Sequence, residues 1–115
     1  MAANGYESLL LTYLSMGDGA SLKPKRLYMV VEHFKNGDAR PVYRRFRASG
    51  RMAPDGLVYV SSWVDEQLKH CYQLMETHDP ALLHQWMEKW NDLVDFEVHP
   101  VLTSSEATEK IGHRL

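Results

Sequence analysis

The sequence predicts an α+β domain of the ferredoxin-like type, with strands and helices in the order βαββαβ. Three observations lead to this prediction. Leu27–Val31 is a nearly continuous apolar run, which is typical of a central strand buried on both sides. Three further segments are rich in β-branched and aromatic residues or alternate apolar with polar ones. Two stretches between the strands carry apolar residues at helical spacing.

The first helix follows a break in the chain at Asn36-Gly37-Asp38. Asp38 is a good capping residue, and Pro41 is tolerated in a first helical turn, where its missing amide has no partner. One face of this helix carries apolar side chains, and Gly50 marks its end. The residues of that face are Ala39, Val42, Tyr43 and Phe46.

The second half of the chain predicts a hairpin, a helix and a last strand. Leu57–Val64 and Cys71–Thr77 are two strands joined by a polar turn. Asp79-Pro80 is a cap followed by a favoured first helical residue. The apolar arc of that helix holds Leu82, Leu83, Trp86, Met87 and Trp90. Val94–Val98 alternates as a half-buried strand, and Pro100 indicates an edge position.

The chain therefore divides into three parts. Residues 1–26 are an N-terminal extension, in which the spacing from Tyr6 to Leu14 fits a short helix that docks loosely or is poorly ordered. Residues 27–103 are the α+β domain. Residues 104–115 are a polar C-terminal tail that we expect to fray.

Right-handed crossovers fold this order of elements into a four-stranded antiparallel sheet with two helices on one face. The other face then carries Val, Tyr, Trp and Met side chains with nothing to cover them, and soluble monomers avoid such a patch. We therefore expect a homodimer that pairs two such faces as a dimeric α/β barrel.

Composition limits the possible partners. The chain of 115 residues has 44% apolar and 24% charged residues and a net charge of −2, so no overall field favours nucleic acid or a membrane surface. No apolar run approaches the ~20 residues of a membrane span. Cys71 is the single cysteine, which excludes an internal disulfide and fits a cytoplasmic location.

From Leu27 to about Ala107 the chain resembles a family of short, mostly bacterial proteins of unknown function, which is placed with the dimeric α/β-barrel proteins. The segments that carry the resemblance are spread over both halves of the domain. They are Leu27–Phe34, Val42-Tyr43, Arg45–Arg47, Gly50–Met52, Pro54–Leu57, Ser62–Val64, Cys71–Thr77, Asp79-Pro80, Trp86, Trp90 and Asp92–Val98.

The resemblance implies the fold and the dimer, and it supplies no catalytic residues, because the family has no established activity. The first 26 residues depart from the family pattern. The wider barrel group includes cofactor-independent monooxygenases, lactone isomerases and stress-induced binding proteins, but likeness of fold alone says little about function.

In such a barrel, a site would lie between the sheet and its partner or at the barrel mouth. His33 is the best acid–base candidate, because imidazole titrates near neutral pH. Alternation places Glu97 and His99 opposite the apolar side chains of the last strand, where either can meet His33 from the neighbouring strand. The simpler alternative is a histidine at the barrel rim, bonded to water or to a backbone carbonyl.

Candidate ligand contacts come from the strands. Alternation puts Tyr59, Ser61 and Trp63 on one face, and Gln73 and Glu97 complete the predicted pocket, with Tyr28 or Met29 beside them. Trp86 and Trp90 are expected in the core.

Two further side chains have both a structural and a functional interpretation. Glu32, within an apolar strand, needs a partner such as Arg51 or Arg47, or is a neutral carboxyl in a pocket with a raised pKa. Cys71 is expected as a small buried thiol rather than a nucleophile.

The sequence contains no metal-ligand spacing, and we expect neither a metal nor a cofactor. Three functional hypotheses remain open. The chain binds a small molecule in the barrel without a cofactor, or it is a cofactor-independent monooxygenase- or isomerase-like enzyme with His33 as base, or it is a structural dimerisation domain.

Overall fold

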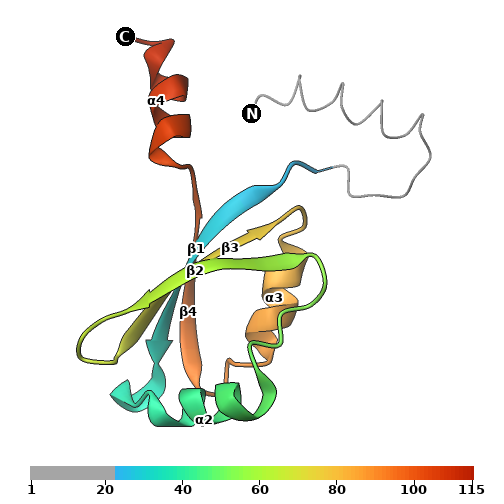
Figure 1. Cartoon of the computed structure of the whole chain (residues 1–115), viewed down its shortest axis with the longest axis vertical. Coiled ribbons are helices and arrows are strands. Elements are labelled where there is room, and N and C mark those ends of the chain that lie inside the picture. The colour runs from blue at the N-terminus through green and yellow to red at the C-terminus, as the bar shows by residue number, and fades with distance from the viewer. Residues whose placement is uncertain (1–22) are drawn as a thin grey trace, which may run out of the picture.

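Within the described residues, the chain forms an α+β fold with a four-stranded antiparallel sheet and three α-helices (Figure 1). The computed structural model describes residues 23–115, so the helix expected near Tyr6–Leu14 lies outside the described residues. In chain order the elements are β1 (Arg26–Phe34), the 3₁₀ turn η1 (Lys35–Gly37), α2 (Arg40–Ser49), β2 (Leu57–Val64), β3 (His70–Thr77), α3 (Ala81–Glu88), β4 (Val94–Val101) and α4 (Ser104–Gly112).

The strand order is β2-β3-β1-β4, with every neighbouring pair antiparallel. This order is compatible with the predicted ferredoxin-like topology. β1 is central as predicted, and β2 and β4 are the two edges. Pro100 therefore lies on an edge strand, where its missing N–H breaks no interior ladder.

Side chains on one face of the sheet are buried beneath α2 and α3. Tyr28, Val30 and Phe34 of β1 belong to this core, together with Val42 of α2 and Leu83 of α3. Trp86, Met75 and Val94 complete its most deeply buried part. Both helices thus cover the same face, which we call the helix face.

The opposite face, which we call the open face, has no covering element among the described residues. Its apolar side chains include Met29 and Val31 of β1 and Leu74 of β3, all half-buried. Trp63 of β2 and Tyr72 of β3 pair across the two strands there, and Trp63 is 55% exposed.

A β-bulge in β2 changes one prediction. The register of β2 against β3 shifts between Tyr59 and Ser61, so that Tyr59 pairs with Met75 and Ser61 pairs with Leu74. Val60 is the extra residue, and the bulge reverses the alternation that follows it. Tyr59 consequently lies on the helix face and Trp63 on the open face; the prediction that they share a face was wrong.

The C-terminal segment also differs from expectation, because a helix stands where a frayed tail was expected. Thr103 caps α4 by accepting a hydrogen bond from the Glu106 backbone N–H, while the Glu106 carboxylate accepts one from the Thr103 N–H. This reciprocal capping box satisfies two backbone donors. Nevertheless, α4 buries no residue and projects away from the sheet (Figure 1).

Candidate functional site

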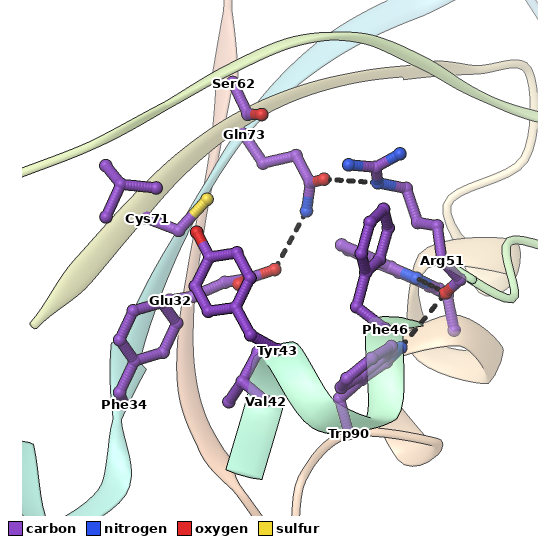
Figure 2. Close-up of a pocket in the computed structure, with 12 residues that line it drawn as sticks. Glu32, Phe34, Val42, Tyr43, Phe46, Arg51, Ser62, Cys71, Gln73 and Trp90 are labelled. Carbon is purple, nitrogen blue, oxygen red and sulfur yellow. Dashed lines mark hydrogen bonds between the residues drawn. The ribbon is translucent and has the colours of Figure 1, made fainter. Parts of the chain in front are cut away.

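A pocket of about 160 Å³ lies on the helix face, between the sheet and the helices (Figure 2). Its walls are largely apolar and aromatic, and a few polar groups converge inside it, as is usual for small-molecule sites. The lining residues are Glu32, Phe34, Val42, Tyr43, Phe46, Arg51, Ser62, Val64, Cys71, Gln73, Trp86 and Trp90.

Glu32 supplies the buried carboxyl group of this pocket. It lies on the helix face because it follows Tyr28 and Val30 at alternate positions of β1, and it is only 8% exposed. Burial raises the pKa of its carboxyl group to about 7, although the charge of Arg51 and a hydrogen bond from Gln73 both act to lower it. At neutral pH the protonated and ionised forms of this carboxyl group therefore coexist.

Gln73 joins Glu32 to Arg51. Its side-chain amide donates to Glu32 Oε2 at 2.8 Å, and its carbonyl oxygen accepts from Arg51 Nε at 2.6 Å (Figure 2). Both bonds fix the orientation of the amide. The result is a chain of three polar groups from the middle of β1 to the segment after α2.

The polypeptide around Arg51 is held in place by two tryptophans. Trp86 Nε1 and Trp90 Nε1 both donate to the Arg51 carbonyl oxygen, at 3.0 and 3.1 Å. The guanidinium group lies 3.7 Å from the ring centroid of Tyr59 and 5.2 Å from that of Phe46. These contacts place a cation at the pocket between two aromatic rings.

The other acidic groups of the pocket stay protonated at neutral pH. Burial and, to a smaller extent, the charge of Glu32 raise the pKa of the Cys71 thiol to about 12. Burial also raises the pKa of Tyr43. Since the thiolate is the nucleophilic form, the structure agrees with Cys71 being a buried structural thiol.

His33 and Glu97 lie on the open face, outside this pocket. As predicted, they meet from neighbouring strands, with His33 Nε2 and Glu97 Oε1 2.5 Å apart. His99 Nε2 lies 3.2 Å from the other oxygen of Glu97. The hydrogen bonds from His33 and then His99 lower the pKa of Glu97.

A third histidine, His70, continues this cluster across the open face. The rings of His33 and His70 meet edge-on with centroids 4.8 Å apart. His70 Nδ1 lies 2.7 Å from an oxygen of Asp65 in the hairpin turn. Despite these contacts, no group of three or more His, Cys, Asp or Glu residues within 23–115 is arranged to hold a metal ion.

The five predicted site residues thus separate onto two faces. Gln73 lines the pocket. Tyr59 does not line it, but the Tyr59 ring lies against the guanidinium group of Arg51, which does. His33, Trp63 and Glu97 lie on the open face. They do not form one pocket within a single chain, because the sheet lies between the two groups.

Sequence reasoning missed the aromatic wall supplied by α2. Tyr43 and Phe46 lie on the predicted apolar face of α2, and residues on such a face usually pack in the core. In the structure both line the pocket. Both are instead rather exposed, at 46% and 41%. The useful signal was Glu32 in an apolar strand, because a carboxyl group there requires polar partners.

Comparison with protein families gives one match. Residues 26–114 match the family described as Domain of unknown function (DUF3303). The chain belongs to this family. The expectation of an uncharacterised family is therefore confirmed, and the family description gives no activity. No curated protein matches the chain, and no solved structure matches it.

One finding bears on membranes. Within the part of the chain that the structure describes, no helix has the length and apolar character needed to cross a bilayer.

Proposed function

We propose that this chain binds a small organic molecule in the pocket of the helix face, without a cofactor. The observation that carries the proposal is the polar chain Glu32–Gln73–Arg51 inside an aromatic-walled cavity. A core that served stability alone would gain from replacing a buried carboxyl group by an apolar side chain. Retaining it beside a cavity is typical of a binding site.

The walls and the size of the pocket indicate the kind of ligand. Drug-sized ligands occupy roughly 300–1,000 Å³, and this cavity measures about 160 Å³. The ligand is therefore small, with about one ring. Phe34, Phe46 and Trp86 offer it apolar contact, while Glu32 and Arg51 select for a polar or anionic group at one end.

We also propose that two copies pair through their open faces as a dimeric α/β barrel. Support comes from the half-buried Met29, Val31 and Leu74 and the exposed Trp63 and Tyr72, which together form an apolar surface across three strands. A two-fold axis lets one such surface cover another. The dimer does not enclose the helix-face pocket.

A second candidate function is a cofactor-independent, monooxygenase- or isomerase-like enzyme with His33 as base. The contact of 2.5 Å between His33 and Glu97 favours it, because a carboxylate bonded to one ring nitrogen can hold a general base in a fixed orientation. Its site would be the space between two paired sheets. If His33→Ala abolished a turnover that Glu32→Gln left intact, this function would replace the first.

The proposal is tested by binding of small aromatic compounds. A panel containing phenylpyruvate, benzoate, phenol and cyclohexanecarboxylate is added to the full chain, and the melting temperature is recorded. We expect at least one compound to raise it, because a ligand of the native state stabilises that state. Phe46→Ala, which removes a pocket wall, should reduce the shift.

Leu68→Ala is the matched control, because Leu68 lies in the hairpin turn and is exposed. The control should retain the full ligand-induced shift. If no compound of the panel changed the melting temperature and none perturbed the pocket residues in NMR spectra, small-molecule binding would be rejected. The enzyme with His33 as base and the dimerisation domain would then be the remaining functions.

A further inference from the structure

The pocket places an acid–base group and a fixed cation on either side of one amide. Gln73 bonds to Glu32 Oε2, and no hydrogen bond within residues 23–115 is made by Glu32 Oε1. Arg51 donates from Nε to Gln73, and within residues 23–115 its two terminal nitrogens donate no hydrogen bond. Glu32 and Arg51 both line the pocket, so a molecule that occupies it has a carboxyl group and a guanidinium group in its surroundings (Figure 2).

We propose that this pocket moves a proton on a small aromatic carbonyl compound, with Glu32 carrying the proton and Arg51 holding the carbonyl oxygen. The proposal rests on the proposed function, because the compound must first bind in the helix-face pocket. It adds a substrate class and a reaction, which is keto–enol tautomerisation.

The step balances without an oxidant or any other co-reactant. Ionised Glu32 removes a proton from the carbon next to the carbonyl group. The electron pair of that C–H bond forms the C=C bond, and the carbonyl π electrons move to the oxygen. Arg51 stabilises the resulting oxyanion, as fixed hydrogen-bond donors do where charge develops. Protonated Glu32 then returns the proton to oxygen, giving the enol, or to carbon, giving the ketone.

The chemistry of the surrounding groups favours Glu32 as the proton carrier. A general acid–base group works best when its pKa lies near the operating pH, and burial brings the pKa of Glu32 to about 7. Burial raises the pKa of Cys71 to about 12 and also raises that of Tyr43, so neither is an effective base at neutral pH. Arg51 carries a proton at any relevant pH and cannot accept one.

Aromatic substrates are favoured by the walls of the pocket. Phe46 and Trp90 line it beside Arg51, and aromatic rings pack against one another edge-on or offset. Phenylpyruvate has the required parts, namely a ring, an acidic C–H next to a ketone, and a carboxylate that matches a guanidinium group. It serves as the probe, whatever the natural compound is.

The experiment measures deuterium uptake at C3 of phenylpyruvate in D₂O by proton NMR, with the full chain and in protein-free buffer. Binding is measured separately from the fluorescence of Trp86 and Trp90. We expect the protein to accelerate exchange by about 100-fold or more, as is usual for a positioned acid–base group. The rate should rise with pH through about 7, as Glu32 ionises.

Three variants make the assignment specific. Glu32→Gln should bind phenylpyruvate and exchange it at the buffer rate. Arg51→Met should lower the exchange rate of bound phenylpyruvate, because it removes the group that stabilises the oxyanion. Glu88→Gln, which changes an exposed carboxylate of α3 outside the pocket, should leave the exchange rate unchanged. Melting curves show whether each variant is folded.

The outcomes separate this inference from the proposed function. If phenylpyruvate bound without faster exchange, or if Glu32→Gln exchanged as fast as the unaltered chain, the tautomerase would be refuted while binding stood. If phenylpyruvate failed to bind but benzoate or phenol bound, the substrate class would be wrong. Only failure of the whole panel would reject the binding function as well.

Discussion

Glu32 carries an ionisable group at a position where the native state has little water to solvate its charge. Its carboxyl pKa is about 7 in the folded chain against an ordinary value of 4.5. The folded state therefore binds the proton more tightly than the unfolded state does. The stability that this group contributes is fully present below about pH 4.5 and is lost as the pH rises through about 7.

The first prediction concerns the pH dependence of folding. A rise in the pKa from 4.5 to about 7 corresponds to a loss on the order of 3 kcal/mol in the free energy of unfolding. Glu32→Gln should remove most of that loss, so the variant should be the more stable protein at pH 8. Urea denaturation between pH 4.5 and 8 measures the difference.

Glu88→Gln serves as the control, because it also removes a carboxylate but from an exposed position on α3. It should keep the pH dependence of the unaltered chain. Equal pH profiles for Glu32→Gln and the unaltered chain would mean that Glu32 ionises in the native state as easily as in water.

Among the structural elements, the turn before β2 requires a glycine. Gly56 has φ +94°, a conformation that L side chains rarely adopt, and a Cβ atom there would lie 2.9 Å from Leu82 Cδ1 of α3. Strand and helix thus approach each other closely at this point. The glycine allows both the turn and the approach.

The second prediction follows from that contact. Gly56→Ala should lower the free energy of unfolding by about 1–2 kcal/mol, through backbone strain and displacement of Leu82. Gly112→Ala is the matched control, because no neighbouring atom lies within 4 Å of a Cβ at that position. Urea denaturation should show a loss for the first variant and none for the second.

The third prediction concerns α4, whose formation depends on local bonds because it buries no residue. Thr103→Ala removes the side-chain half of the capping box and should cost about 1 kcal/mol of helix stability. A change of about 1.4 kcal/mol alters an equilibrium constant tenfold, so a cost of about 1 kcal/mol raises the population of opened helix roughly fivefold. Hydrogen exchange of the backbone amides of α4 should become faster by the same factor.

The same variant should leave the amides of β1 as protected as before, because α4 is separate from the sheet (Figure 1). Thr108→Ala, within the exposed surface of α4, is the control and should not speed exchange. An equal loss of protection in β1 and α4 would show that the helix and the sheet unfold together.

At the scale of the whole molecule, the two faces of the sheet have different properties. The helix face holds the core and the pocket, whereas the open face presents apolar side chains and the cluster of His33, His70 and Glu97. Our proposals give each face its own role, namely ligand binding on the first and pairing with a second copy on the second.

The fourth prediction tests that pairing. The unaltered chain should sediment as a dimer. Leu74→Glu, which introduces a charge into the middle of the open face, should sediment as a monomer, because a buried unpaired charge is costly. Leu68→Glu in the exposed hairpin turn should remain a dimer. A monomeric unaltered chain at micromolar concentration would contradict the proposed assembly.

Periodicity in the sequence was sufficient to predict the strands, α2 and α3, and the meeting of His33 with Glu97. These features depend on residue spacing along the chain and on the strand order, and the right-handedness of crossover connections leaves few possible strand orders. Alternation also placed Glu97 and His99 opposite the apolar residues of β4. The capping box that begins α4 was present in the sequence as Thr103 and Glu106, but the polar composition around it suggested a tail.

Only the tertiary structure decided where a cavity would lie. The bulge at Val60 separates Tyr59 from Trp63, and strict alternation cannot reveal a residue that breaks it. The link from Glu32 through Gln73 to Arg51 joins β1, β3 and the segment after α2. Side-chain spacing along one segment determines which face a residue occupies, whereas a pocket depends on distances between segments that only packing sets.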